Sequence, residues 1–303
     1  MTSSIYVIIV NWNGKDDTIT CLQSLHRDEY TNKKIIVVDN GSGDGSVSAI
    51  RSHFPHITIL ENTKNTGFTG GNNTGIRFAL DNGADYVFLL NNDTTVERDT
   101  ILKLAEVYEH DRKYGIAVPA IFSMDDPEKP LFVGSKVDFY RGTAIHDNSR
   151  ETKREAVPFD IPWATGCAMF MSAEIMKAAG GFDDRYFLNW EDVDLSFRVR
   201  NLGYSIAIVP AARVYHKAGE SLKLLDHSLV FFYYNVRNRL LFNVTHNKSF
   251  YRHALCYIAS ECVSTWLRLL MKGQIRAMYR AVVFTIYAFH DHISQRYGPY
   301  RGK

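Results

Sequence analysis

Asp93 is the first residue whose surroundings suggest chemistry. It follows an apolar stretch at residues 86–90 and two asparagines, Asn91 and Asn92. Together they place one carboxylate and two amide oxygens at the end of a predicted strand, and such hard oxygen donors suit Mg²⁺ or Mn²⁺ carrying a diphosphate. An Asx turn would use the same residue types without any ligand. The local sequence leaves both interpretations open.

A second candidate group opens a predicted helix next to Trp190, where Glu191, Asp192 and Asp194 follow in close succession. Acidic residues are common in a first helical turn, because they complement the helix dipole. Three carboxylates within four positions repel one another, however, and removing one of them from water would raise its pKa toward the range of a general base. The segment is therefore a candidate catalytic site as well as an ordinary helix start.

His216 and Asp39 are two further candidates. A lone histidine such as His216 is more often structural than a metal ligand. Asp39 begins a glycine-rich loop that is similar to a dinucleotide fingerprint, but Ser46 stands where the third glycine belongs. A carboxylate at Asp39 would repel a pyrophosphate, so it is better suited to accept hydrogen bonds from a base or ribose. A simple turn residue is the alternative.

These candidates follow the strands of a predicted parallel sheet. Apolar runs alternate with helical patterns, the strands at 5–10, 35–38, 57–60 and 86–90 and the helices at 18–27, 46–53 and 73–80. Strands that are apolar on both faces predict an α/β fold with a doubly wound, mainly parallel sheet. Ligands in such folds bind beyond the carboxyl ends of the strands. The loops expected there are all rich in Asn, Asp and Gly, at 11–14, 39–43, 65–73 and 91–93.

The second half of the sequence is less regular. We expect strands at 132–139, 167–171 and 205–209, and helices at 173–179 and 192–201. From residue 224 onward the pattern changes to long, aromatic-rich amphipathic helices. We therefore predict an α/β domain at 1–220 and a C-terminal amphipathic helical extension at 221–303.

Charge is distributed unevenly along the chain, although the net charge is only +2. Residues 221–303 carry 12 basic and 3 acidic residues, whereas residues 1–220 carry 23 basic and 30 acidic residues. The acidic first part argues against binding to nucleic acid. The basic tail suggests a different partner from that of the α/β domain.

The tail mixes aromatic and basic side chains, as interfacial amphipathic helices do, and we expect it to dock on a membrane surface. Core packing or a homo-oligomer interface is the alternative. The apolar run at 254–271 is interrupted by Glu261 and Arg268, so we expect no spanning helix. The residues concerned are Phe231, Phe232, Tyr233, Tyr234, Trp266 and Tyr287 among Arg237, Arg239, Arg252, Arg268, Lys272, Arg276 and Arg280.

Cysteine usage and the N-terminus bear on the compartment. The four cysteines are scattered without CxxC spacing, which predicts reduced thiols in a cytoplasmic protein rather than disulfides or a structural zinc site. The first residues lack the basic and apolar regions of a secretory leader, so secretion is not expected.

Six motifs occur in order between residues 5 and 216, and together they resemble family 2 glycosyltransferases, in particular the bacterial rhamnosyltransferase-like branch that builds cell-surface polysaccharides. The resemblance implies a GT-A fold, with nucleotide-sugar binding in 1–120 and the acceptor and catalytic half in 121–220. The motifs are Val7–Asn13, Val37–Ser42, Asn65–Gly75, Leu90–Asp93, Glu191–Asp194 and Val214–His216.

The resemblance also implies roles for individual residues. Asp93 matches the last acid of the metal-binding DXD motif, and Asn91 and Asn92 stand here in place of its first acid. His216 matches a histidine that completes the site for Mn²⁺ or Mg²⁺. Asp192 matches the catalytic base and adjoins Glu191 and the acceptor-side Trp190. Asp39 would read the base. The nucleotide-sugar contacts implied are Asn11, Asn13, Asp39, Asn40, Gly67, Gly71, Asn72 and Asn92.

The expected activity is inverting, metal-dependent transfer of a hexose from a dTDP- or UDP-linked donor, with dTDP-rhamnose the first choice. The expected acceptor is a hydroxyl of a growing, lipid-linked cell-surface glycan at the inner face of the plasma membrane. Two alternatives remain. A sugar-nucleotide pyrophosphorylase would want a basic glycine-rich loop after the first strand, where this chain has Asn11–Gly14. A non-catalytic nucleotide-sugar-binding protein would not need Glu191, Asp192 or His216. A dehydrogenase is disfavoured by Asp39.

Overall fold

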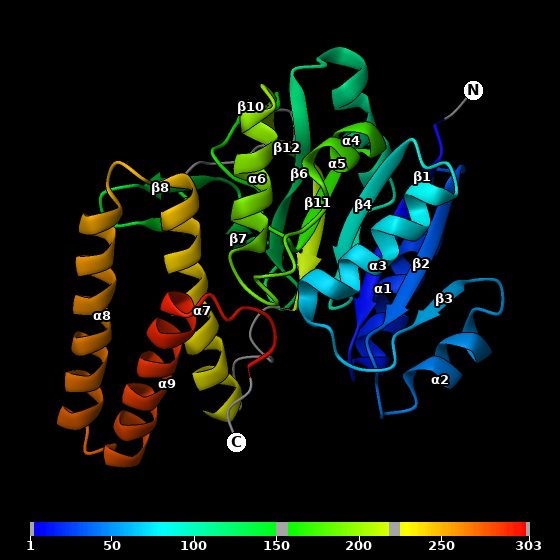
Figure 1. Cartoon of the computed structure of the whole chain (residues 1–303). Coiled ribbons are helices and arrows are strands. Elements are labelled where there is room, and N and C mark those ends of the chain that lie inside the picture. The colour runs from blue at the N-terminus through cyan, green and yellow to red at the C-terminus, as the bar shows by residue number, and fades with distance from the viewer. Residues whose placement is uncertain (1–2, 150–156, 218–224, 301–303) are drawn as a thin grey trace. The chain divides into compact units, whose positions relative to one another are not determined.

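The computed structural model describes residues 3–149, 157–217 and 225–300 and divides into two compact units (Figure 1). The sheet unit comprises residues 1–136, 146–183 and 192–218, and the helical unit comprises residues 137–145, 184–191 and 219–303. The boundary expected near residue 220 falls outside the described residues. Two short segments that the sequence places in the α/β domain group with the helices instead.

The sheet unit contains a ten-stranded mixed sheet flanked by helices (Figure 1). Its main strand order is β10-β12-β6-β11-β4-β1-β2-β3, while β5 pairs with β12 and β7 pairs with β6. The strands are β1 (Ile5–Asn11), β2 (Lys33–Asp39), β3 (Thr58–Glu61), β4 (Tyr86–Asn91), β5 (Thr94–Val96), β6 (Tyr114–Ser123), β7 (Pro130–Phe132), β10 (Phe159–Asp160), β11 (Ala168–Ser172) and β12 (Ser205–His216). The helices are α1 (Lys15–Arg27), α2 (Ser46–His53), α3 (Gly67–Asp81), α4 (Thr100–His110), α5 (Ala173–Ala179) and α6 (Glu191–Asn201).

The parallel core of the sheet confirms the predicted fold class. β1 pairs in parallel with both β2 and β4, and β2 pairs in parallel with β3. Val7, Ile8 and Ile9 of β1 are completely buried, as expected for a central strand covered on both faces. β11 runs antiparallel between β4 and β6, a reversal that the sequence pattern did not predict.

The glycine-rich segment after β3 is helical rather than a loop, so the expected loop at 65–73 was largely wrong. α3 begins at Gly67, six residues earlier than predicted. Because glycine is a poor helix former, nothing in the sequence indicated that the helix begins here. Packing requires a residue without a side chain, because a Cβ at Gly71 would lie 2.7 Å from Cγ1 of Val10. A Cβ at Gly75 would collide with Ile8. The glycines thus let α3 pack directly on β1.

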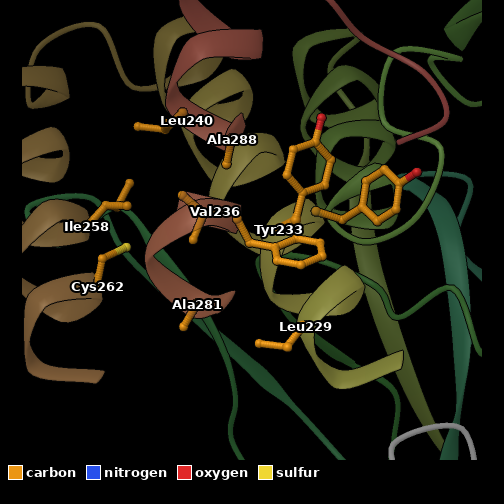
Figure 2. Close-up of a cluster of buried hydrophobic side chains, with 10 residues drawn as sticks. Leu229, Tyr233, Val236, Leu240, Ile258, Cys262, Ala281 and Ala288 are labelled. Atoms are coloured by element: carbon orange, nitrogen blue, oxygen red, sulfur yellow. The ribbon is translucent and has the colours of Figure 1, made fainter. Parts of the chain in front are cut away.

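The helical unit is built from α7 (Leu225–His246), α8 (Tyr251–Met271) and α9 (Ile275–Ile293). A separate two-stranded sheet is formed by β8 (Ser135–Asp138) and β9 (Thr143–His146). The strand expected at 132–139 is therefore divided between β7, which pairs with β6, and β8, which pairs with β9. Figure 2 shows the core of the three helices, where Tyr233 and Leu240 of α7 join Ile258 and Cys262 of α8.

This packing divides the aromatic and basic residues of the tail into two sets. Tyr233 and Tyr234 are buried in the core, and Arg237 and Arg239 are almost fully buried as well. These members of the set hold the helices together. Phe231, Tyr287 and the cations of α8 and α9 remain exposed. This second set is available to a partner.

Buried polar side chains of α7 bind the backbone of the segment at residues 184–191. Nδ2 of Asn238 donates to the carbonyl oxygens of Tyr186, Leu188 and Asn189 at 2.7–2.8 Å. The backbone is left-handed at Phe187, Asn189 and Trp190, with φ of 63°, 69° and 71°. Non-glycine residues rarely adopt this conformation, which costs free energy, so the bonds from α7 stabilise a strained path.

α8 is long and apolar enough to cross a membrane by length and composition, and it is the one such helix in the described ranges. From Glu261 and Arg268 in the sequence we expected no helix of this length and apolar composition. Core helices of soluble proteins can have the same length and composition. In the structure Ile258 and Cys262 of α8 pack in the core, and Glu261 forms an ion pair with Arg239 of α7.

Candidate active site

Asp93 and His216 come together because β5 pairs antiparallel with β12. Asp93 stands between β4 and β5, and His216 lies opposite Thr94 in the ladder. Nε2 of His216 is 3.2 Å from both carboxylate oxygens of Asp93, and its hydrogen bond is to Oδ2. The other oxygen, Oδ1, is buried without a hydrogen-bond partner. A buried carboxylate oxygen without a partner is costly unless a ligand satisfies it.

The charge state of the histidine follows from these neighbours. Burial opposes the charged form of His216, but Cys167 and Asp93 more than offset this and raise its pKa to about 11. Burial raises the pKa of the Cys167 thiol, and the neighbouring His216 counteracts this in part. The sequence offered no signal for Cys167 beyond a predicted strand start. The structure adds it to the site as a neighbour of His216.

Asp192 lies in the sheet unit near the beginning of β11. Its Oδ2 accepts a hydrogen bond from the backbone N–H of Gly166 at 2.9 Å, and its Oδ1 accepts from the N–H of Val193 at 2.8 Å. Burial raises the pKa of the Asp192 carboxyl, and these two hydrogen bonds only partly counteract it. A Cβ at Gly166 would lie 3.1 Å from the ring of Phe68 and 3.4 Å from Cβ of Asp192. The first turn of α3 therefore also reaches this site.

Gly166 and Cys167 connect the two groups of functional side chains. Asp192 bonds to Gly166, and the next residue, Cys167, interacts with His216. The carbonyl oxygen of Cys167 accepts a hydrogen bond from the N–H of Asn91 at 2.9 Å, which fixes this point beside the end of β4. The structure thus brings Asp93, His216 and Asp192 to one edge of the sheet. Their large separations in the sequence gave no direct indication of this contact.

The loops after β1 and β2 hold one another through side-chain amides. Nδ2 of Asn11 donates to Oδ1 of Asp39 at 2.8 Å, and Oδ2 of Asp39 accepts from the N–H of Ser42 at 2.9 Å. Asn13 is exposed, has a left-handed backbone with φ of 54°, and accepts from the N–H of Gly43. Asp39 and Asn11 are buried, whereas Asn13 faces solvent beside them. A nucleotide role for all three residues stays a prediction.

The other expected nucleotide contacts are engaged largely within the protein. Asn40 is buried and bonds to Asn62, Asn65, Thr66 and Gly67, which fixes the chain just before α3. Asn72 is buried and donates to the carbonyl of Phe68 in its own helix. Asn92 is half-buried and donates to Oγ1 of Thr18 at 3.0 Å. Gly67 and Gly71 are buried at the start of α3.

Trp190 and Glu191 belong to the segment that groups with the helical unit. Nε1 of Trp190 donates to Oδ1 of Asn235 at 2.8 Å, and its ring packs 5.2 Å from that of Phe242. Glu191 is the first residue of α6 and is only 5% exposed. The acceptor-side role of Trp190 and a catalytic role of Glu191 stay predictions.

The carboxylate of Asp93 fits a divalent ion, because its buried oxygen Oδ1 has no hydrogen-bond partner. His216 would join it only as neutral imidazole, so the ion would have to displace the proton that the raised pKa keeps on this side chain. Within residues 3–149, 157–217 and 225–300, no group of three or more His, Cys, Asp or Glu side chains could hold a metal. Mg²⁺ and Mn²⁺ in nucleotide sites commonly take one or two protein ligands and complete their shell with phosphate oxygens and water.

Comparison with known proteins identifies the class. Residues 6–178 match the family described as Glycosyl transferase family 2, so the chain belongs to this family and is a glycosyltransferase. The mannosyltransferase PcManGT from Pyrobaculum calidifontis, solved in complex with GDP-Man and Mn²⁺, has a similar structure, with a TM-score of 0.61 and 16% identity, covering 98% of this chain and 88% of that one. The sheet unit is accordingly a GT-A fold.

Curated relatives place the chain nearer to a branch of the family. It is 25% identical over 247 residues to the dTDP-rhamnosyl transferase RfbF of Shigella flexneri, covering 80% of each chain. It is also 25% identical over 240 residues to the N-acetylglucosaminyl-diphospho-decaprenol L-rhamnosyltransferase of Mycobacterium tuberculosis, covering 73% of this chain and 78% of the relative. The chain is therefore a rhamnosyltransferase-like member of family 2.

Proposed function

We propose that this glycosyltransferase inverts the anomeric configuration of its donor sugar, with Asp192 as the catalytic base. The observation that carries the proposal is the convergence of Asp192 with Asp93 and His216 through the adjacent residues Gly166 and Cys167. A single displacement by an acceptor hydroxyl needs a base on one side of the sugar and charge stabilisation on the other. This edge of the sheet offers both.

Asp192 takes the proton of the acceptor hydroxyl as that oxygen attacks the anomeric carbon. The N–H groups of Gly166 and Val193 orient the carboxylate. Burial raises its pKa, which makes the ionised carboxylate a stronger base than an exposed aspartate. One displacement without a covalent sugar intermediate gives inversion.

Asp93 and His216 would hold Mn²⁺ or Mg²⁺. The bound ion would stabilise the negative charge that develops on the departing nucleoside diphosphate. Asp39, Asn11 and Asn13 would hold the nucleotide, with Asp39 accepting hydrogen bonds from the base. The bonds from Asn11 and from the Ser42 N–H already fix the Asp39 carboxylate in one orientation.

For the donor we propose dTDP-rhamnose, and a UDP-linked sugar is the alternative. The named activities of the Shigella and mycobacterial relatives support rhamnose. The mycobacterial name also supports a lipid-linked acceptor. We further propose that the enzyme works at the inner face of the plasma membrane, held there by the exposed cations of its helical unit. Glu261 and Arg268 interrupt the apolar run of α8, which favours a surface location for this helix over a transmembrane one.

A screen of nucleotide sugars tests the proposal. The protein is melted with each sugar in the presence of Mn²⁺, since a ligand that binds only the folded state raises the melting temperature. Sugars that stabilise the protein are then assayed for release of the nucleoside diphosphate and for the anomeric configuration of the product by NMR. Stabilisation and turnover with dTDP-rhamnose are expected. Turnover with retention of configuration, or no turnover with any donor, would overturn the mechanism.

A further inference from the structure

The turn between α8 and α9 exposes an unusual number of large apolar side chains. Met271 is 81% exposed, Ile275 62% and Tyr279 67%, while Leu267 and Leu270 are each about half exposed. Gly273, with φ of +68°, makes the turn tight. Clusters of exposed apolar residues in a soluble unit mark an interaction surface.

The charges around this turn have one sign. Between residues 262 and 290 the chain has four cations, Arg268, Lys272, Arg276 and Arg280, and no Asp or Glu. All four are exposed. Apolar tips surrounded by lysine and arginine match an anionic bilayer, because the apolar groups enter the headgroup boundary while the cations meet lipid phosphates. A protein partner would need a matching acidic and apolar face, whereas a membrane supplies both without a specific fit.

An apolar groove opens at the same end of the three helices. It has a volume of about 670 Å³ and is lined by Leu229 and Phe232 of α7, Leu269 of α8, and Ile275, Arg276 and Ala281 of α9. The volume falls in the range of small-molecule sites, roughly 300–1,000 Å³. Its walls are apolar apart from the cation of Arg276 and a few polar groups. The groove is therefore suited to a hydrocarbon chain whose anionic end lies near Arg276.

We propose that this helix-end groove binds one hydrocarbon chain of an anionic membrane lipid, which enters it from the bilayer on which the α8–α9 turn lies. Arg276 pairs with the lipid phosphate, and Leu229, Phe232 and Leu269 cover the chain. The inference rests on the proposed function for the location of the enzyme at a membrane. A lipid-linked acceptor would belong to the same chemical class, a phosphate ester with a long apolar chain.

Two measurements on the full chain test the surface and the groove separately. Vesicles of phosphatidylglycerol should sediment the protein at low salt, and vesicles of phosphatidylcholine should not. The double variant Arg268→Glu and Lys272→Glu, at two exposed positions outside the groove, should weaken sedimentation roughly tenfold or more. Arg27→Glu with Arg112→Glu is the control, since both residues are exposed in the sheet unit and the net charge change is the same. Equal loss in both double variants would overturn docking through the turn.

The groove is tested with lysophosphatidylglycerol below its critical micelle concentration, by calorimetry. One molecule should bind per chain, and inorganic phosphate should give no comparable heat. Ala277→Phe, which fills the groove from its α9 wall, should weaken binding at least tenfold. Ser264→Phe adds the same ring at an exposed position of α8 outside the groove and should bind as the wild type does.

If Ala277→Phe fails to fold, Thr265→Asp places a repelling charge on the lining and serves instead. Unchanged lipid binding in both variants, or a wild-type dimer that Ala277→Phe dissociates without any lipid binding, would overturn the proposal. Asp192→Asn must bind the lipid normally, because the groove does not depend on catalysis. An inactive wild-type enzyme that still binds one lipid would therefore refute the proposed function and leave the groove standing.

Discussion

The candidate site of the sheet unit and the contact of α7 with residues 184–191 in the helical unit both bury polar side chains, but they satisfy them differently. In the sheet unit, Oδ1 of Asp93 is buried without a hydrogen-bond partner, and Asp192 has its pKa raised by burial. In the helical unit, the side-chain amide of Asn238 donates to three carbonyl oxygens, and Arg237 donates to the carbonyls of Arg185, Tyr186 and Gly298. The first pattern leaves groups available for a reaction, and the second uses them to hold the backbone.

The largest effect is expected at the base. Asp192→Asn should lower the rate of transfer on the order of 10²-fold or more, because the variant cannot accept the acceptor proton. Donor binding, followed by thermal stabilisation, should be nearly unchanged. Asp194→Asn is the matched control, since Asp194 forms an ion pair with Arg198 at 2.7 Å and is 1% exposed. This control should melt at a lower temperature but keep its turnover per folded molecule. Near-normal turnover of Asp192→Asn would move the role to Glu191 or Asp194.

The metal site should give the next largest effect. Asp93→Ala and His216→Ala should each raise the Mn²⁺ concentration for half-maximal activity on the order of tenfold or more, as a lost ligand or ligand partner does. Titration of activity with Mn²⁺ after treatment with EDTA measures this. Full wild-type activity in excess EDTA would exclude the metal. If His216→Ala leaves the Mn²⁺ dependence unchanged while Asp93→Ala weakens it, His216 has a structural role and does not bind the metal.

Replacing a hydrogen-bonded polar side chain of α7 should lower the free energy of unfolding. Asn238→Leu removes the side-chain donor from the carbonyls of Leu188 and Asn189, whereas the carbonyl of Tyr186 keeps its hydrogen bond from Arg237. Two buried carbonyls without this donor should cost about 1–3 kcal/mol of unfolding free energy. Thermal melting would record a drop of several degrees. Asn82→Leu is the comparison, because Asn82 makes one exposed bond to its own helix and should change the melting temperature little. Equal melting of both variants would remove the distinction drawn between the units.

The pH dependence should show the smallest effect. Asp192 must be ionised to accept a proton, and burial raises its pKa, so kcat/KM should fall as the pH drops through a midpoint above that of an ordinary aspartate, about 4. Cys167 and His146 are the other titratable groups that influence this carboxyl. The residual activity of Asp192→Asn should not show this fall of kcat/KM at low pH. A wild-type midpoint at or below the ordinary value would contradict a buried base.

Much of the sheet could be predicted from local sequence. β1, β2 and β4 lie within one or two residues of the apolar runs that predicted them, since a buried parallel strand needs continuous apolar side chains. α3 was predicted to start too late, because the reason for its glycines is contact with Val10 and Ile8 of another strand. Such contacts leave no local signal.

The candidate site was predictable as a set of residues but not as an arrangement. Motifs made Asp93, Asp192 and His216 candidates, yet the place where the structure brings them together depends on the antiparallel course of β11 and on the pairing of β5 with β12. Cys167 was missed because a single cysteine at a strand start has no distinguishing pattern. The assignment of residues 184–191 to the helical unit rests on bonds from Asn238, more than forty positions away.

The reversed direction of β11 has a consequence for how this enzyme can diversify. An antiparallel strand starts where its parallel neighbours end, so the chain that leads into Gly166 arrives at the edge that β1, β2 and β4 leave. Exchanges in the stretch 161–165, between β10 and β11, should therefore alter the surroundings of Asp192 without shifting the register of β1 with β2 or β4. This stretch is separate in the sequence from the loops after β1 and β2 that we propose bind the nucleotide. Recombination that grafts residues 161–165 from a relative should yield new acceptor preferences on an unchanged donor site.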